Sequence, residues 1–350
     1  MAETIRLLDS VDATTCAGGM LLSQGPRALR ARGPKTWLER AVAEFRDGVA
    51  VPAPDDRGAF ARLVGALRQQ GWVTSEPVAG PELDGLPHQR QVGYLGLFGD
   101  APARMQRRLS AARVAVIGVG GIGALLAQQL VAAGVRHLWL VDHDEVEAHN
   151  LNRQHLYVRA DIGVPKVAAA ATRLAATAPD VVVTGVRRRI TTSDDLADLP
   201  QDLDLVVVAA DSPADIAGIC WAWAALAQVP VAMAAVGLDT GYWGPLLVPS
   251  MGHCWWCFDT ERRSRLSADE GRMEATVHAP TPYSFGPSNA TIAALLSHDV
   301  LRFLASGQAL TLGARGHLRF DTGSTTIFRG PEACGCPPGP HRQPSGHPSV

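Results

Sequence analysis

Apolar runs alternate with amphipathic stretches along the middle of the chain, which predicts strands that alternate with helices. Each run has the length and apolar content of a strand that is buried on both faces of a parallel sheet. The four expected strands are Val114–Ile117, His137–Val141, Val181–Val186 and Leu203–Ala210. Between the first two, Ala124–Ala133 carries apolar residues at helical spacing. The pattern predicts an α/β fold with a Rossmann-like, doubly wound and mostly parallel sheet.

The last third of the chain predicts further strands around one long helix. Val231–Val236 and Tyr242–Val248 are expected strands, and Asn289–Ala305 is an expected helix. His317–Asp321 and Thr325–Arg329 are expected to pair as a hairpin. Antiparallel strands are therefore expected at the C-terminal side of the sheet.

The first 75 residues predict a separate small domain. Gly19–Arg32 alternates and is punctuated by Gly-Pro pairs, as in a β-hairpin. Lys35–Arg46 and Asp56–Gln70 carry apolar residues at helical spacing, and Trp72-Val73 begins a short strand. This order predicts a winged-helix-like domain over residues 1–75. The remaining boundaries are expected to be a linker over 76–87, a larger domain over 88–336 and a disordered tail over 337–350.

Composition and charge exclude several classes of protein. A net charge of −2 over 350 residues gives no electrostatic argument for nucleic-acid binding. The longest apolar stretch, Ile216–Ala227, is too short to span a membrane and predicts a buried helix. No signal peptide is recognised at the N-terminus, and six cysteines do not make a disulfide scaffold in a chain of this length. A cytoplasmic protein without nucleic-acid or membrane partners is expected.

A glycine-rich turn after the first strand predicts a nucleotide site. Glycine permits a tight turn, lets backbone N–H groups approach phosphate oxygens, and leads into a helix whose N-terminus favours anions. Asp142 ends the next strand, where a carboxylate can accept hydrogen bonds from ribose hydroxyls. The four glycines are Gly118, Gly120, Gly121 and Gly123.

Polar residues after Asp142 favour a triphosphate over a dinucleotide. Asp144, Asn150 and Arg153 supply the charge and oxygen contacts that a triphosphate with its metal needs. Lys166 stands in the first turn of an expected helix, where a cation is unfavourable unless an anion lies nearby. Asp211 follows the fourth strand, above the crevice in which such sheets bind ligands. The three arginines at 187–189 are expected to be a solvated edge.

Two cysteine pairs predict a structural zinc site. Four thiolates from two distant pairs form a closed tetrahedral zinc site. The pairs are Cys254 with Cys257 and Cys334 with Cys336, and the second, CxC, is tighter than the usual spacing. A charged, mobile loop is expected over Asp259–Glu274, after the first pair. Cys16 and Cys220 are expected to be inert thiols.

These motifs together resemble the ThiF/MoeB/HesA family, relatives of ubiquitin-activating enzymes, over roughly residues 86–336. The matching motifs are GxGGxG, D-x-D-x-V-x-x-x-N-L-x-R-Q and Pro-Lys-Val. The resemblance implies a homodimer in which Arg90 reaches the phosphates of the neighbouring subunit. It also implies that Lys166 contacts ATP and that Asp211 holds Mg²⁺. The family has Asp-Asn where this chain has Asp211-Ser212, so no role is carried over to Ser212.

The N-terminal domain resembles the RiPP recognition element, a winged-helix clamp that binds leader peptides by strand addition. A plain packing domain and a DNA-binding winged helix are the alternatives, and acidic residues such as Asp47, Asp55 and Asp56 argue against DNA. In relatives that form thioesters, the catalytic cysteine lies in a crossover loop, but residues 258–333 contain none.

Together, the resemblances imply adenylation of a carboxylate of a precursor peptide. Three alternatives remain: an adenylyltransferase for a small ubiquitin-like sulfur carrier, a non-catalytic leader-peptide presenter, and an NAD-dependent oxidoreductase. Arg153, Lys166 and Asp211 argue against the last.

Overall fold

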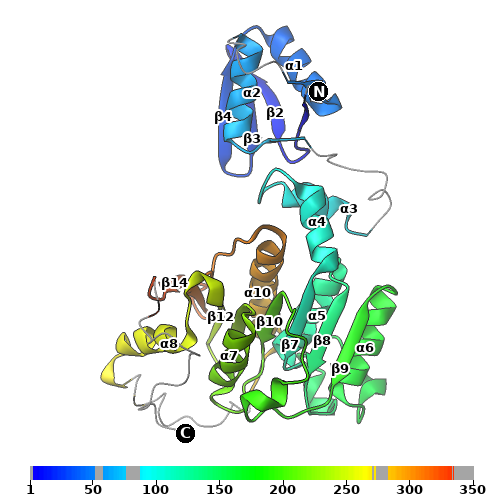
Figure 1. Ribbon diagram of the computed structural model, residues 1–350, viewed down its shortest axis with the longest axis vertical. Helices are drawn as coiled ribbons and strands as arrows, with labels where there is room; N and C mark the ends of the chain where they lie inside the picture. Colours follow the sequence, from blue (N-terminus) through cyan, green and yellow to red (C-terminus); the bar gives the residue numbers. More distant parts are fainter. Residues whose placement is uncertain are drawn as a thin grey trace. The chain divides into compact units, whose positions relative to one another are not determined.

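The computed structural model describes residues 3–51, 58–75, 87–269, 272, 283–332 and 334. The chain divides into two compact units, Met1–Leu109 and Ser110–Val350 (Figure 1). The expected tail over 337–350, most of the expected linker and Cys336 lie outside the described residues. A search of the described part for a helix with the length and apolarity of a membrane span found none.

The first unit contains two small antiparallel sheets. β2, β3 and β4 form one sheet in that order, and β1 lies between β5 and β6 in the other. Helices α1 and α2 are amphipathic, and Phe45 of α1 stacks on Phe60 of α2 in the apolar core. The elements are β1 (Thr4–Leu7), β2 (Asp12–Cys16), β3 (Gly19–Gln24), β4 (Arg27–Arg32), α1 (Lys35–Asp47), β5 (Val49–Ala50), α2 (Ala59–Gln69), β6 (Val73–Thr74), α3 (Gln89–Leu95) and α4 (Pro102–Ala111).

The second unit is built on one eight-stranded sheet with the order β14-β13-β12-β11-β10-β7-β8-β9. The five strands from β11 to β9 are parallel, and β12, β13 and β14 continue the sheet in antiparallel pairing. The strands are β7 (Arg113–Ile117), β8 (His137–Val141), β9 (Val182–Val186), β10 (Leu205–Val208), β11 (Val231–Val236), β12 (Thr240–Leu247), β13 (Ala314–Arg319) and β14 (Thr325–Arg329). The predicted doubly wound, mostly parallel sheet with antiparallel strands at its C-terminal side is confirmed.

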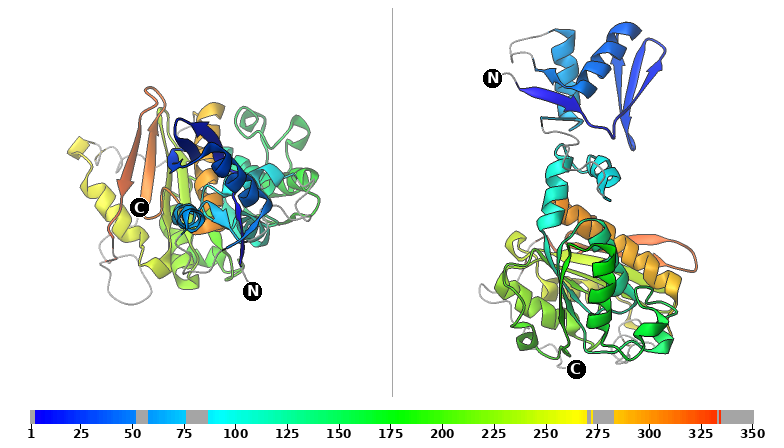
Figure 2. Two further views of the ribbon diagram at one scale, coloured as in Figure 1. Left: turned by 90° about the horizontal axis from the view of Figure 1, so that it is seen from above. Right: turned by 90° about the vertical axis from the view of Figure 1, so that its right-hand side faces the viewer.

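Helices cover both faces of this sheet (Figures 1 and 2). α5 (Gly121–Ala132), α6 (Lys166–Thr177) and α10 (Gly286–Ser306) bury one apolar face, and α5 packs along α10. α7 (Ile216–Ala227) and α8 (Trp255–Ser264) cover the other face. Short 3-10 helices complete the unit: η1 (Ala148–Asn150), η2 (Arg159–Asp161), η3 (Ser193–Leu196) and η4 (Pro249–Met251).

Helix α8 corrects the loop expected after the first cysteine pair. Trp255 and Phe258 are buried against the sheet, while Asp259 pairs with Arg262 and Arg263 one turn later. The charged residues thus stabilise a helix through i,i+3 and i,i+4 pairs. The expected loop is therefore wrong over Asp259–Ser264, where the stretch is helical.

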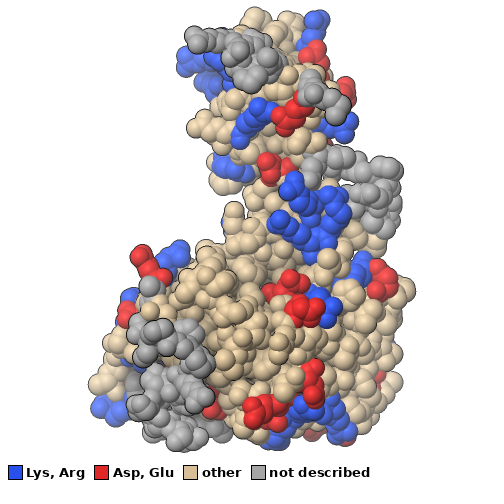
Figure 3. Space-filling view, in the orientation of Figure 1, with Lys and Arg blue, Asp and Glu red and all other residues tan. Residues whose placement is uncertain are grey.

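Charge is unevenly distributed on the face drawn in Figure 3. Positive side chains gather over α4, where Arg104, Arg107 and Arg108 are exposed. Elsewhere on this face, acidic and basic side chains are intermixed.

Candidate active site

A cavity of about 480 Å³ opens at the carboxyl ends of the parallel strands in the second unit. The strand order reverses between β7 and β10, and crevices at such points bind ligands in open α/β sheets. The walls come from the glycine turn, the segments after β8, β9 and β10, the last residues of β11, and the start of α10. Most of the candidate residues named from the sequence meet here: Gly118, Gly120, Gly121, Asp142, Asp144, Asn150, Arg153, Lys166 and Asp211.

Three glycines of the turn lie so close to other atoms that a Cβ would not fit without rearrangement. Gly118 has φ +87°, and a Cβ there would lie 2.8 Å from the backbone of Ala210. A Cβ on Gly123 would lie 1.9 Å from the carbonyl oxygen of Gly118. At Gly121 it would lie 2.2 Å from Oδ1 of Asn289, a buried residue of α10. Gly120 is the residue preceding α5, and it borders the cavity.

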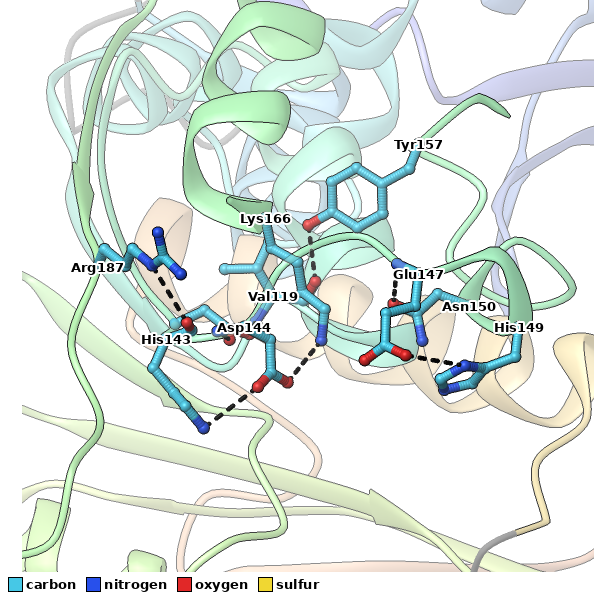
Figure 4. Close-up of polar contacts among 10 residues, drawn as sticks. Val119, His143, Asp144, Glu147, His149, Asn150, Tyr157, Lys166 and Arg187 are labelled. Atoms are coloured by element: carbon cyan, nitrogen blue, oxygen red, sulfur yellow. Dashed lines mark hydrogen bonds and ion pairs between the residues drawn. The ribbon is translucent and has the colours of Figure 1, made fainter. Parts of the chain in front are cut away.

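The backbone N–H and the backbone carbonyl of Val119 are both hydrogen-bonded to side chains, which fixes the conformation of the turn. The Val119 N–H donates to Oδ2 of Asp142 at 2.8 Å. The Val119 carbonyl oxygen accepts from the Tyr157 hydroxyl at 2.8 Å (Figure 4). Burial, with the charges of Asp142 and Asp161, raises the pKa of Tyr157. The hydroxyl therefore stays protonated and remains a donor at any physiological pH.

Lys166 and Asp144 form an ion pair in the cavity wall. The Lys166 side chain is 7% exposed, and its Nζ lies 2.8 Å from Oδ2 of Asp144 (Figure 4). His143 approaches the other carboxylate oxygen at 3.2 Å. Burial raises the pKa of Asp144, but the hydrogen bond and charge of Lys166 outweigh burial and hold this pKa below its usual range. The anion expected beside Lys166 is therefore supplied, in this structure, by Asp144.

Asn150 and Arg153 are placed by the short helix η1. Asn150 is buried, and its Oδ1 accepts from the Glu147 N–H at 3.0 Å (Figure 4). Nη1 of Arg153 donates to the carbonyl oxygen of His149 and to Oδ1 of Asn152, both at 2.9 Å. Because both acceptors are neutral, the positive charge of Arg153 has no carboxylate partner among the described residues.

Asp211 is an exposed carboxylate at the cavity wall, beyond the end of β10. Within the described ranges, no hydrogen bond or ion pair reaches its side chain. A carboxylate in this position is suited to bind an Mg²⁺ ion, because this ion is commonly bound by one or two carboxylates together with phosphate oxygens.

Several wall residues were not identified from the sequence. Arg188 was expected at a solvated edge, but it lines the cavity, and its guanidinium pairs with Asp198 at 2.7 Å. Tyr283 and Ser284 line it just before α10, far from the glycine turn in sequence. Arg90, by contrast, lies on α3 in the first unit, where its side chain is exposed.

Three cysteines meet at a second site, beside α8. The Sγ atoms of Cys254, Cys257 and Cys334 all lie within 4.8 Å of one another, and those of Cys257 and Cys334 are 3.6 Å apart. Thiolates about 2.3 Å from a tetrahedral zinc ion would lie roughly 3.8 Å apart, so the three thiols fit such an ion. Cys220 lies elsewhere, buried in α7, where burial raises the pKa of its thiol.

Comparisons with known proteins agree with this architecture. A sulfur carrier protein adenylyltransferase of Thermus thermophilus is 44% identical over 107 residues, or 31% of this chain, and this match spans only 39% of that relative's length. The ThiS adenylyltransferase of Escherichia coli is 28% identical over 262 residues, 73% of this chain and 94% of that protein.

Solved structures show the same fold. E. coli MccB, crystallised with AMPCPP and MccA, matches with a TM-score of 0.76 at 22% identity, over 95% of this chain and 100% of that one. The model of the ThiF family matches residues 88–333. The chain described here therefore belongs to the ThiF family.

Proposed function

We propose that the protein catalyses ATP-dependent adenylation of a carboxylate. The observation that carries this proposal is the convergence of the glycine turn, Lys166, Arg153 and Asp211 on one cavity at the switch point of the sheet. Two cations and a helix N-terminus suit a triphosphate, and an unpaired carboxylate suits its metal ion. The curated relatives named above are adenylyltransferases, in keeping with this assignment.

In the proposed reaction, a carboxylate oxygen of the substrate attacks the α-phosphorus of ATP. A new O–P bond forms, and the bond from the α-phosphorus to the oxygen bridging to the β-phosphorus breaks. The electron pair of that bond leaves with pyrophosphate, and an acyl-adenylate remains. No proton has to move, because the carboxylate is already ionised. The protein's task is to align the reactants and to neutralise phosphate charge.

Each cavity residue has a defined part in this proposal. Asp142 accepts hydrogen bonds from the ribose, and Asp211 holds Mg²⁺, which would neutralise phosphate charge. Arg153 and Asn150 bind phosphate oxygens. Lys166 exchanges part of its contact with Asp144 for a phosphate oxygen. In a homodimer, Arg90 of the neighbouring subunit adds another cation.

For the substrate, we propose a precursor peptide held by the N-terminal domain, which we assign to residues 1–75. A groove between β2 and α1 is lined by Thr15, Met20, Val42 and other side chains. Within the described residues, β2 is an edge of its sheet. The register that pairs Cys16 with Gly19 directs the Thr15 N–H away from β3, so it can pair with an added strand. This arrangement suits the leader-peptide clamp that the sequence resembles.

A sulfur-carrier protein is the second candidate substrate, because the two relatives named above are sulfur carrier protein adenylyltransferases. A non-catalytic presenter is disfavoured, because the candidate phosphate ligands Arg153 and Lys166 both line the cavity. We also propose that zinc is held by Cys254, Cys257 and Cys334, with Cys336 as the fourth ligand. Four thiolates leave no open coordination position, so this zinc would stabilise the fold and take no part in the chemistry.

ATP–pyrophosphate exchange tests the adenylation proposal. Exchange should appear when candidate peptides or a small ubiquitin-like carrier are added, and Asp211→Ala should abolish it while the circular dichroism spectrum stays unchanged. Exchange by Asp211→Ala within a few-fold of wild type would contradict the magnesium role. Comparing the two substrate types identifies which one the enzyme activates.

A further inference from the structure

Gln154 is a buried residue of the cavity wall whose side chain carries an unused acceptor. It is 3% exposed, and its Oε1 has no hydrogen-bond partner among the described residues. Its backbone is anchored, because its N–H donates to the carbonyl oxygen of Asn150 at 2.9 Å and its carbonyl oxygen accepts from the Tyr157 N–H at 3.1 Å. The side chain is therefore held in a fixed segment, with one polar atom left unmatched.

The other end of the same carboxamide faces the glycine turn. Nε2 of Gln154 lies 3.7 Å from the position that a Cβ on Gly120 would occupy, and Gly120 immediately precedes α5. An anion bound at this helix N-terminus would lie beside an N–H donor of Gln154. The amide thus offers a donor next to the expected phosphate position and an acceptor that is still unpaired.

A buried acceptor without a donor costs free energy in the empty protein. Such a cost is characteristic of binding sites, where a ligand completes the hydrogen bond. A ligand that completes this hydrogen bond supplies an N–H or O–H group at this point. Triphosphate oxygens and a substrate carboxylate carry no such donor at neutral pH, and the adenine amino group of ATP lies at the far end of the nucleotide from the phosphates expected beside Gly120. The ribose hydroxyls and the waters of a bound magnesium ion are therefore the expected donors, and both are O–H groups.

We infer that Gln154 is a nucleotide-binding residue whose Oε1 accepts a hydrogen bond from an O–H group brought in with ATP, while Nε2 donates to a phosphate oxygen. This inference rests on the proposed adenylation function and adds a ligand to it. It also explains why a polar side chain is buried at a position where the described part of the protein offers no donor.

The test compares Gln154→Met with Gln24→Met, a matched change at a buried glutamine whose amide is fully used. Nε2 of Gln24 donates to Ser10 and Gly96, and its Oε1 accepts from Arg27. In the ligand-free protein, Gln154→Met should unfold thermally at or above the wild-type midpoint, whereas Gln24→Met should unfold lower. Calorimetric titration with ATP and Mg²⁺ should show roughly tenfold weaker binding for Gln154→Met and unchanged binding for Gln24→Met.

Two further titrations distinguish the donors. If the difference between wild type and Gln154→Met disappears with 2′,3′-dideoxyATP, the donor is a ribose hydroxyl. If it disappears with ATP in EDTA, the donor is a water on the metal. A difference that survives both changes overturns the assignment to an O–H group.

If Gln154→Met binds ATP and Mg²⁺ within twofold of wild type, the inference about Gln154 is overturned but the proposed function is not. A loss of stability equal to that of Gln24→Met would have the same meaning. Absence of binding by the wild-type protein would instead contradict the proposed function. If Gln154→Met does not fold, Gln154→Ala, which leaves space for water, is measured in the same way.

Discussion

Tyr157→Phe should lower both the stability of the protein and its affinity for ATP. The substitution removes one oxygen and leaves the ring that packs in the core around α5. The carbonyl oxygen of Val119 then loses the donor that lies 2.8 Å away. Because this contact is buried, water cannot replace the lost hydroxyl without rearrangement.

The size of the effect follows from that geometry. A buried acceptor left without a donor costs about 1–3 kcal/mol. For a domain of about 150–250 residues, 1 kcal/mol shifts the thermal midpoint by roughly 2–4 °C, so a decrease of about 2–12 °C is expected. The effect should not depend on pH between about 6 and 9, since burial keeps the pKa of Tyr157 above its usual value.

Thermal unfolding followed by circular dichroism, with and without ATP and Mg²⁺, measures both effects. With the Val119 carbonyl released, the turn loses one of the two side-chain contacts to Val119 and keeps the contact with Asp142 at 2.8 Å, so the shift induced by ATP should also become smaller. Tyr94→Phe, at a tyrosine that is 50% exposed, is the control and should change both values less than Tyr157→Phe, because water can replace an exposed hydroxyl. A Tyr157→Phe protein with the wild-type midpoint and the wild-type response to ATP would refute the reasoning.

Three other predictions concern the partner subunit, the metal and the peptide. Mixing inactive Arg90→Ala with inactive Asp211→Ala should restore part of the exchange activity, because one site of each mixed dimer is complete; no recovery despite verified subunit exchange would rule out a shared site. Elemental analysis should find one zinc per chain, and Cys257→Ser should lose the metal and unfold at lower temperature, whereas Cys16→Ser, at an exposed cysteine, should keep both. Metal-free wild-type protein purified without chelator would count against the zinc site. Thr15→Pro removes one N–H of an edge strand and should raise the KM for a precursor peptide at least tenfold at unchanged ATP affinity; an unchanged KM would exclude strand addition at β2.

The parallel core of the fold could be predicted from the sequence because its signals are local. Strands such as β8 (His137–Val141) and helices such as α7 (Ile216–Ala227) are continuous apolar runs, and both were predicted with the observed bounds. β1 and β2 were missed because they are short and mix polar with apolar residues, and their pairing partners lie elsewhere in the chain. α8 was missed because its charged residues dominate its sequence, although two aromatic side chains anchor it.

The candidate site was predictable where its residues lie in one stretch. Asp142, Asn150 and Arg153 come from a single segment, and all three line the cavity. Asn289 gives no such signal, because its contact with the glycine turn exists only once α10 packs along α5. The role of Tyr157 was equally hidden, since a single tyrosine in a loop does not reveal that its hydroxyl reaches Val119.

The contact between Gly121 and Asn289 has a consequence for how the protein is made. The ribosome completes the glycine motif long before it reaches α10, yet α10 and the two residues Tyr283 and Ser284 supply one wall of the cavity. A nascent chain that stops before residue 283 would hold the whole glycine motif and still lack that wall. A nucleotide that needs this wall can stabilise the protein only after α10 has been synthesised, so the elements before α10 must first fold by their own packing.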